Sequence, residues 1–434
     1  MTLKFIDLFA GIGGIRKGFE LACDSRGIHH HCVFSSEIKS SAIDVLKQNH
    51  PEDVIHGDIT QIDPQLIPDF DVLLGGFPCQ AFSSAGKRQG FNDTRGTLFF
   101  SVANILKAKR PSGFVLENVE GLVNHDMVHA KKGSKIGHTL SVILNTLDEL
   151  GYKVTWKILN AADYGVPQNR KRIYIIGTKL SKPNLKNLER STSTLGPLLE
   201  KGLPISNTKF VNRLLSLYPL EQLPGKKCKD KRGGRNNIHS WDLELKGKLS
   251  KREKKLLNMM MTQRRKHIWA DQWGLDWMDG MPLSLEMIKC FSDYPDLEKD
   301  LNDCVSKGYL KFEHPKQLIH DSNGATHREA AINKSFGYNI VAGKMSFEVN
   351  EILDPKTIAP TLVAMDMGHL YVVDGTGIRP LSLREGLRLF GYPDDYKFDI
   401  DIKSGYDLLG NTVVVPVIKL VSERLLDALK GESQ

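Results

Sequence analysis

The first 180 residues alternate short β-rich runs with helix-like spans, and this alternation limits the folds that are open to the chain. Each β-rich run ends at a glycine, a turn or a carboxylate. Strands that alternate with helices are typical of an α/β fold, with a mostly parallel sheet covered by helices on both faces. The predicted strands are residues 4–10, 30–37, 53–59, 70–77, 112–119, 154–160 and 172–178.

Helical patterns fill several of the spans between these strands. The most regular one covers residues 134–150, where Ser134 is the predicted N-cap and Gly151 lies just beyond the predicted end. A helix-rich pattern returns near the carboxyl end of the chain. The other predicted helical segments are residues 97–109, 381–393 and 408–430.

The alternating pattern ends near residue 182, and no regular period follows it. Within this second region Trp269, Trp273 and Trp277 are four residues apart, which predicts one buried helical face. We therefore expect a separate, irregular domain between the two ends of the chain. The predicted division is a catalytic and cofactor-binding domain at 1–187 completed by 405–434, an irregular domain at 188–375 and a connecting segment at 376–404.

Positive charge is concentrated in one part of the chain. The 434 residues carry a formal net charge of +8. Residues 225–267 alone contain 15 Lys and Arg against 4 Asp and Glu, so the rest of the chain is slightly acidic. Such a segment is either a solvated surface or a face that binds a polyanion, because neutralising phosphates releases counterions.

The composition also argues against several classes of protein. No apolar run reaches about 18 residues, so we expect no transmembrane helix. The first residues lack the pattern of a signal peptide. Six cysteines without a CxxC pair argue against a disulfide scaffold and against the commonest zinc sites, and we expect no metal. These features predict a reduced, cytoplasmic protein.

The stretch "FIDLFAGIGG" (5–14) predicts a strand that runs into a glycine turn and then a helix. Glycines at such a turn let a ligand approach the backbone and the free N–H groups of the helix. Glu37 and Asp58 end the next two predicted strands, where carboxylates can bind ribose hydroxyls and an adenine amino group. The pattern predicts a nucleoside cofactor site, although a tight turn beside two solvated acids would look the same. The predicted turn residues are Ala10, Gly11, Ile12, Gly13 and Gly14.

The stretch "GGFPCQAFSSAGKRQGF" (75–91) places Pro78 and Cys79 at the carboxyl end of the fourth predicted strand, the edge where open α/β sheets bind ligands. A cysteine there can simply be part of the core. The residues on either side of Cys79 favour a nucleophile. Glycines surround Cys79 and cations follow it, which suits a loop that closes over an anionic substrate. The cations of this loop are Lys87, Arg88 and Arg95.

Two further stretches carry charged groups at strand ends. Glu117 in "ENVEGL" would lie beside Cys79, across neighbouring strand ends, where an acid can protonate or hydrogen-bond a substrate. Arg170 and Arg172 in "QNRKRIYIIG" alternate into the last predicted strand and would point to one side. Taken alone, these two arginines are equally compatible with exposed charges at a sheet edge.

Six blocks of the sequence, taken in order, resemble the DNA (cytosine-5)-methyltransferase family. They cover the first 180 and the last 60 residues, approximately. The resemblance implies a Rossmann-like, S-adenosylmethionine-dependent fold with a variable target-recognition domain, which matches the irregular 188–375 region. The blocks are "DLFAGIGG", "GGFPCQAFS", "ENVEGL", "QNRKRIYIIG", "RPLSLREGLRLFGYP" and "GYDLLGNTVVVPV".

The resemblance also implies roles for individual residues. Cys79 would attack C6 of a flipped-out cytosine, Glu117 would bind N3 and the exocyclic amine, and Arg172 with Arg170 would hold O2. S-adenosylmethionine is the implied cofactor, in a pocket formed by Phe9, Ile12, Glu37, Asp58, Ile59, Pro78, Leu98 and Asn411. The expected DNA contacts are Gln80, Ser83, Lys87, Arg88 and Arg95 of the Cys79 loop and Lys226, Lys227, Lys229 and Lys231 of the basic segment.

The expected partner is double-stranded DNA, and we expect a nucleoid-associated monomer whose cognate restriction endonuclease, where one exists, acts separately. A tRNA cytosine-5 methyltransferase is the nearest alternative, but the long insert suits the reading of a duplex. A catalytically inactive DNA-binding regulator is the other alternative. It predicts the loss of Cys79, Glu117 or Arg172, and all three are present.

Overall fold

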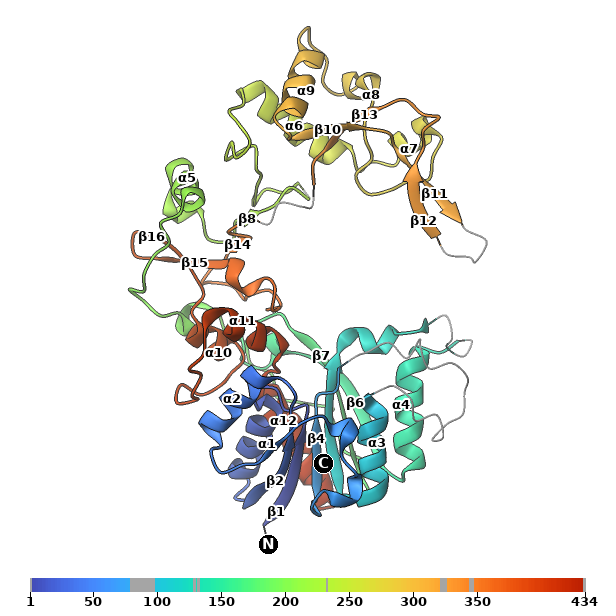
Figure 1. Cartoon of the computed structure of the whole chain (residues 1–434), viewed down its shortest axis with the longest axis vertical. Coiled ribbons are helices and arrows are strands. Elements are labelled where there is room, and N and C mark those ends of the chain that lie inside the picture. Colours follow the sequence, from blue (N-terminus) through green and yellow to red (C-terminus); the bar gives the residue numbers. More distant parts are fainter. Residues whose placement is uncertain are drawn as a thin grey trace. The chain divides into compact units, whose positions relative to one another are not determined.

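The computed structural model describes residues 2–78, 98–127, 130, 133–231, 233–320, 326–342 and 347–431. The chain forms two compact units (Figure 1). Unit 1 comprises Met1–Glu200, Asp354–Gly368 and Leu381–Gln434, and unit 2 comprises Lys201–Leu353 and His369–Pro380. The chain therefore leaves unit 1 twice and returns twice. The segment 381–404, which the sequence analysis placed in a connecting segment, is part of unit 1.

Unit 1 is built on a seven-stranded sheet with the order β3-β2-β1-β4-β5-β7-β6. The first five strands in this order run parallel to their neighbours, while β7 is antiparallel to both β5 and β6. All seven predicted strands are present, and the mostly parallel α/β sheet is confirmed. The strands are β1 (Leu3–Leu8), β2 (His30–Ser36), β3 (Ile55–His56), β4 (Val72–Gly75), β5 (Gly113–Val119), β6 (Lys153–Asn160) and β7 (Lys171–Thr178).

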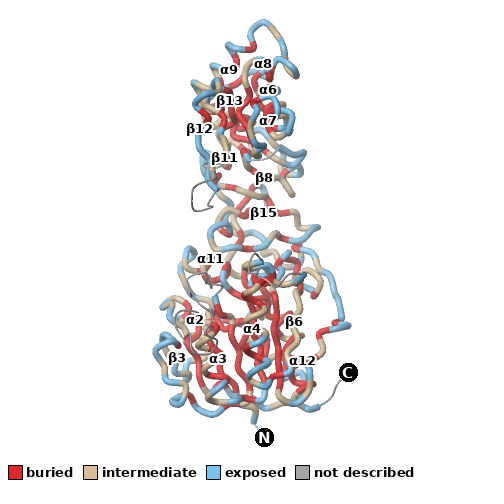
Figure 2. Tube along the Cα trace, turned by 90° about the vertical axis from the view of Figure 1, so that its right-hand side faces the viewer, coloured by how far each residue is buried: buried red, intermediate tan, exposed pale blue. Residues whose placement is uncertain are grey.

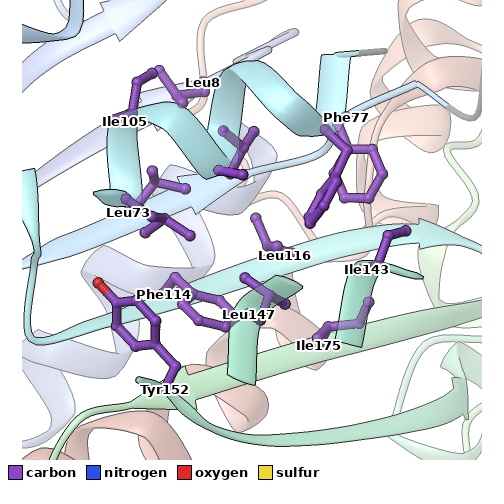
Figure 3. Packing of buried hydrophobic residues seen from close by; sticks show 14 of the residues in the cluster. Leu8, Leu73, Phe77, Ile105, Phe114, Leu116, Ile143, Leu147, Tyr152 and Ile175 are labelled. Atoms are coloured by element: carbon purple, nitrogen blue, oxygen red, sulfur yellow. The ribbon is translucent and has the colours of Figure 1, made fainter. Parts of the chain in front are cut away.

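Helices cover both faces of this sheet, whose central strands are almost entirely buried (Figure 2). On one face, Ile105 of α3 and Leu147 of α4 pack against Leu116 and Ile175 of the strands (Figure 3). On the other face α1 packs against α12. The helices of unit 1 are α1 (Gly14–Ser25), α2 (Ser40–Asn49), α3 (Leu98–Lys109), α4 (His138–Glu149), α10 (Leu383–Leu389), α11 (Ile402–Asn411) and α12 (Val415–Leu429).

The predicted start of the 134–150 helix is wrong. The helix begins at His138, and the hydroxyl of Ser134 bonds within its own turn, to the carbonyl of Ile136 at 2.7 Å. The physical reason lies at Gly137, whose backbone N–H donates to the carbonyl of Val123 at 2.7 Å. A Cβ at position 137 would lie 1.8 Å from the carbonyl oxygen of His125, so this close approach fixes where the helix starts. The predicted end is confirmed by Gly151, which has φ +84°.

Unit 2 mixes short helices with small sheets around two hydrophobic clusters. Its largest sheet has the order β16-β15-β14-β8-β9, and two separate ribbons pair β10 with β13 and β11 with β12. The helices are α5 (Lys209–Leu217), α6 (Lys251–Gln263), α7 (Ile268–Trp273), α8 (Leu285–Lys289) and α9 (Leu297–Ser306). The strands are β8 (Lys227–Cys228), β9 (Asn237–Ile238), β10 (Leu310–Glu313), β11 (Lys316–His320), β12 (Thr326–Ala330), β13 (Gly337–Ile340), β14 (Glu351–Ile352), β15 (Leu370–Asp374) and β16 (Gly377–Pro380).

The expected tryptophan face is correct only in part. Trp269 and Trp273 lie on α7 and are buried in the larger cluster of unit 2. Trp277 lies beyond the helix, because Gly274 ends α7 in a left-handed conformation with φ +61°. The ring of Trp277 is half-exposed and stacks on His267, with the ring centroids 4.3 Å apart. None of the described helices is long and apolar enough to cross a membrane.

Asp7 lies in the middle of the unit 1 sheet, on β1, and its side chain is completely buried. Neither carboxylate oxygen has a hydrogen-bond partner among the described residues. Burial raises the pKa of Asp7 to about 7, Arg16 acts to lower it, and Glu20 and Glu37 raise it further. The folded protein therefore keeps a proton on this carboxyl at a pH where the unfolded chain has lost it.

This raised pKa predicts a stability that falls with pH. Between about pH 4 and pH 7 the folded state binds the extra proton, so the free energy of unfolding decreases as the pH rises through this window. Asp7→Asn removes the titration. The melting temperature of the variant relative to wild type should increase from about pH 4 to pH 7 and level off above pH 7. Asp44→Asn, on the exposed side of α2, is the control. A difference that stays constant with pH for Asp7→Asn would contradict this account.

Candidate active site

A cavity of about 510 Å³ opens at the carboxyl ends of the parallel strands in unit 1. Strands that run in the same direction bring their carboxyl ends to one edge, which is where open α/β sheets bind ligands. The loops after β1, β2, β3 and β4 and the end of β5 all contribute to the lining. The lining includes twelve residues predicted from sequence, namely Phe9, Gly11, Ile12, Glu37, Asp58, Ile59, Pro78, Leu98, Glu117, Arg170, Arg172 and Asn411.

The backbone after β1 turns through left-handed conformations. Phe9 has φ +56° and Gly11 has φ +54°, and a Cβ at Gly11 would meet no atom within 4 Å. Gly11 therefore presents bare backbone to open space. Gly14 has a different role, because a Cβ there would lie 2.5 Å from the hydroxyl of Tyr392. Of the predicted turn, Gly11 and Ile12 line the cavity, whereas Ala10, Gly13 and Gly14 do not.

Glu37 is held firmly beside this turn. Its Oε2 accepts a hydrogen bond from the backbone N–H of Gly11 at 2.7 Å, and its Oε1 accepts from Ile38 and Lys39 at 2.9 Å each. A carboxylate offers about four acceptor positions. The carboxylate of Glu37 thus has its geometry fixed by backbone donors and still has capacity for a ligand hydroxyl.

Asp58 is also held by a neighbouring backbone N–H, and more of its acceptor positions remain available to a ligand. Its Oδ1 caps the short helix 59–61 by accepting from the N–H and the hydroxyl of Thr60, at 2.9 and 2.8 Å. Its Oδ2 has no partner among the described residues and faces solvent with the rest of the exposed side chain. One bare glycine backbone and two oriented carboxylates, with an apolar lining from Phe9 and Ile59, fit an adenosyl group.

Glu117 and Arg172 form the polar end of the cavity. Glu117 is buried near the end of β5, and Arg172 lies on the neighbouring strand β7. The guanidinium Nε of Arg172 is 3.1 Å from Oε1 of Glu117. Burial raises the pKa of Glu117, and Arg172 and then Arg170 act to lower it. The carboxyl is therefore an acid that can hold a proton and donate it to a bound base.

Asn118 was not singled out from the sequence. Its side-chain amide donates to the carbonyl of Phe77 at 2.8 Å, which ties the end of β4 to β5. This bond holds the backbone just before Pro78 close to Glu117. The only sequence signal for this role is the position of the Asn118 amide directly after Glu117 in "ENVEGL".

Arg170 lies just before β7 and is buried, unlike an exposed edge charge. Its guanidinium donates to the carbonyls of Leu362 and Thr412, at 2.8 and 2.6 Å, and to that of Gly410 at 3.3 Å. The ring of Phe390 lies 5.0 Å below it. Burial lowers the pKa of Arg170 to about 10, and Arg172 lowers it further. Arg170 therefore holds the end of α11, where Asn411 lies, and acts on the cavity by positioning this residue.

This contact pattern predicts that Arg170 stabilises the fold of unit 1 and that Arg172 does so much less. Arg170→Lys cannot reach three carbonyls at once and leaves buried acceptors without donors. We expect a loss of roughly 1.5–3 kcal/mol in the free energy of unfolding. Arg172→Lys is the matched control, two residues away, and keeps a cation beside Glu117. Urea denaturation of both variants tests this, and equal stability of the two would rule out the positioning role.

Several predicted residues lie outside the described part of the chain. These are Cys79 and the loop residues Gln80, Ser83, Lys87, Arg88 and Arg95. Pro78, the last described residue before Cys79, lines the cavity that also contains Glu117.

The four lysines predicted to bind DNA in unit 2 differ in their surroundings. Lys227 forms an ion pair with Glu351, with 2.8 Å between Nζ and Oε2. The ammonium of Lys226 donates to the carbonyl of Arg235 at 3.4 Å, Lys229 also has a contact, and Lys231 is exposed. Other cations of the basic segment are paired too. Arg252 binds Asp300, Lys254 binds Glu244, and Arg265 binds Asp279.

Comparison with known proteins places the chain in one family. The family model described as "C-5 cytosine-specific DNA methylase" matches residues 3–427. The chain belongs to this family. It is a DNA (cytosine-5)-methyltransferase, and the predicted family, fold and enzymatic activity are confirmed.

Individual relatives of this methylase match over the whole length. The chain is 60% identical over 427 residues to the type II methyltransferase M.NlaIV of Neisseria lactamica, covering 98% of this chain and 99% of the relative. It is 40% identical over 449 residues to M.BanI of Aneurinibacillus aneurinilyticus, covering 98% and 96%. Among solved structures it resembles the Entamoeba histolytica methyltransferase EhMeth, with 17% identity, a TM-score of 0.52 and 99% of both chains covered.

Proposed function

We propose that this methylase transfers the methyl group of S-adenosylmethionine to C5 of a cytosine within a specific sequence of double-stranded DNA, with Cys79 as the nucleophile. One observation carries the proposal. A single cavity contains the Glu117–Arg172 pair, the oriented carboxylates of Glu37 and Asp58, and Pro78, whose next residue in the chain is Cys79. The parts needed to hold a cofactor and to activate a base thus share one edge of the sheet.

The chemistry follows from these residues. The Cys79 thiolate adds to C6 of the flipped-out cytosine, and the π electrons of the C5–C6 bond become available at C5. Glu117 donates its proton to N3 as negative charge develops there, and Arg172 orients the carboxyl and holds O2 of the base. S-adenosylmethionine supplies an electrophilic methyl group when bound. A base then removes the C5 proton, the electron pair of that C–H bond re-forms the C5–C6 double bond and expels Cys79 as a thiolate, and N3 returns its proton to Glu117.

The cofactor would lie along the opposite part of the cavity. Glu37 would accept the ribose hydroxyls, and Oδ2 of Asp58 would accept the adenine amino group. Phe9 and Ile59 would pack on the adenine, and Asn411, which also lines the cavity, would contact another part of the cofactor. Arg170 supports this arrangement by holding the carbonyls on either side of Asn411.

Unit 2 would be the target-recognition domain of this enzyme. Its mixed, irregular fold is inserted into the sequence of unit 1, and it contains the basic segment. The relatives are named type II methyltransferases. We infer that this chain acts as a monomer and is the modification enzyme of a restriction-modification system, separate from the endonuclease.

Trapping with 5-fluorocytosine tests the nucleophile. A duplex with 5-fluorocytosine at the target base should form a covalent adduct with the wild-type enzyme, because fluorine cannot leave as the C5 proton does. Cys79→Ser should abolish both the adduct and methyl transfer while DNA and cofactor binding are kept. Glu117→Gln, which cannot supply the proton, should form the adduct far more slowly, by about 10²–10⁴-fold. An adduct formed at the normal rate by Cys79→Ser would exclude Cys79 as the nucleophile.

Calorimetric titration with S-adenosylmethionine tests the cofactor pocket. Asp58→Asn keeps the cap on Thr60 and removes the charge that faces the ligand. We expect its affinity to fall by roughly 10-fold or more, because a hydrogen bond to a charged group contributes about 1.5–3 kcal/mol. Asp63→Asn is the matched control, since Asp63 caps the next short helix through the N–H of Gln65 at 2.9 Å and does not line the cavity. Equal affinities in the two variants would argue against this pocket.

A further inference from the structure

The β11–β12 ribbon of unit 2 is an antiparallel pair that no other described strand joins. It stands out from the rest of the unit (Figure 1), and all five residues of β12 are exposed (Figure 2). An isolated two-stranded ribbon is only marginally stable in water. Gln317, Leu318 and Ile319 of β11 are half-buried, whereas β12 is exposed along its whole length and is therefore available to another molecule.

The base of the ribbon is firmly attached to the unit. The backbone N–H of Ala331, which is buried, donates to the carbonyl of Pro315 at 2.8 Å. The ring of His314 bonds to the carbonyl of Lys334 at 2.7 Å, and the rings of Phe312 and Phe336 stack with their centroids 5.2 Å apart. The ribbon is thus presented from an ordered base, which lowers the entropy lost on binding.

The two faces of the ribbon differ in charge. Directly opposed residues share a face, and the register pairs Leu318 with Arg328 and Lys316 with Ala330. This face has two cations and no carboxylate among its described residues. The other face contains Glu329, whose Oε1 is 2.9 Å from Nε2 of His327. Arg328 and Lys316 have no ion-pair or hydrogen-bond partner among the described residues, in contrast with the paired Lys227 and Arg252.

We propose that the β11–β12 ribbon enters the major groove of the DNA with the Arg328 face toward the base edges, and that Arg328 reads a guanine of the target sequence. This inference rests on the proposed function. The major groove admits a two-stranded β-ribbon, and an arginine side chain can bond to O6 and N7 of guanine at once. Lys316 is placed nearer the base of the ribbon and contacts a phosphate. The face with Glu329 points away from the DNA, because a carboxylate would be repelled there.

The experiment uses the full-length enzyme and begins with the wild type. Bisulfite sequencing of a bacterial host that expresses it gives the methylated sequence. A short duplex with that sequence, and the same duplex with the sequence scrambled, are then the probes for fluorescence anisotropy. Wild-type enzyme that methylates no cytosine would refute the proposed function, and this inference with it. All later outcomes concern the ribbon alone.

Four variants distinguish the recognition of a guanine by Arg328 from the attraction of positive charge to the DNA phosphates. Arg328→Ala should lose about 10- to 100-fold in affinity for the target duplex and little for the scrambled one. Arg328→Lys keeps the charge but not the paired donors, so it should lose target preference while binding the scrambled duplex like wild type. Lys316→Ala should weaken both duplexes equally and lower the slope of log affinity against log salt by about 0.9. Gln317→Ala, on the opposite face, is the control and should match wild type.

Two results would overturn the inference. One is an Arg328→Ala variant with the wild-type preference for the target duplex, as expected if the ribbon binds a protein or nothing. The other is an equal loss on both duplexes, which would make Arg328 a phosphate contact. The affinity of each variant for S-adenosylmethionine, which should be unchanged, shows that the enzyme is folded. Bisulfite sequencing of hosts that express Arg328→Lys should show methylation at relaxed sites.

Discussion

The buried guanidinium of Arg170 is the interaction on which the shape of the cavity depends. It binds carbonyl groups that are 192, 240 and 242 residues further along the chain. Burying a charge in this way costs free energy unless its donors are satisfied. Three carbonyl dipoles and the face of Phe390 offset this cost, while Nε of the guanidinium has no hydrogen-bond partner among the described residues. These carbonyls belong to the two later segments of unit 1, Asp354–Gly368 and Leu381–Gln434. Arg170 is paired only when both segments lie in this position.

The pKa of Glu117, in the same cavity, depends on two opposing effects. Burial favours the neutral carboxyl, while the guanidinium 3.1 Å away favours the charged one. The pKa of Glu117 is raised because burial outweighs the nearby positive charge. Burial acts by removing water from the carboxyl, and Arg172 acts through its charge.

The sequence predicted the sheet and most of the cavity, because both follow from local patterns. The carboxyl ends of the parallel strands meet at one edge of the sheet, so the strand pattern alone places Gly11, Glu37, Asp58 and Glu117 close together. The sequence did not predict the features that depend on contacts between distant parts of the chain. The close approach at Gly137 moved the start of α4, and no local signal shows that Arg170 points into the interior. The charge count of the basic segment likewise gave no sign that Lys227 is paired with Glu351, more than a hundred residues away.

The order in which unit 1 is assembled from the chain has a consequence for the cell that makes it. Arg26 near the end of α1 pairs with Asp427 on α12, and these residues are 401 positions apart. A nascent chain on the ribosome lacks α12 until residues 415–429 have been translated, so α1 lacks this packing partner during that time. Asn411, at the end of α11, is also translated after the whole of unit 2. Products truncated before α11 therefore contain Cys79 but lack the part of the cavity that Gly410, Asn411 and Thr412 line.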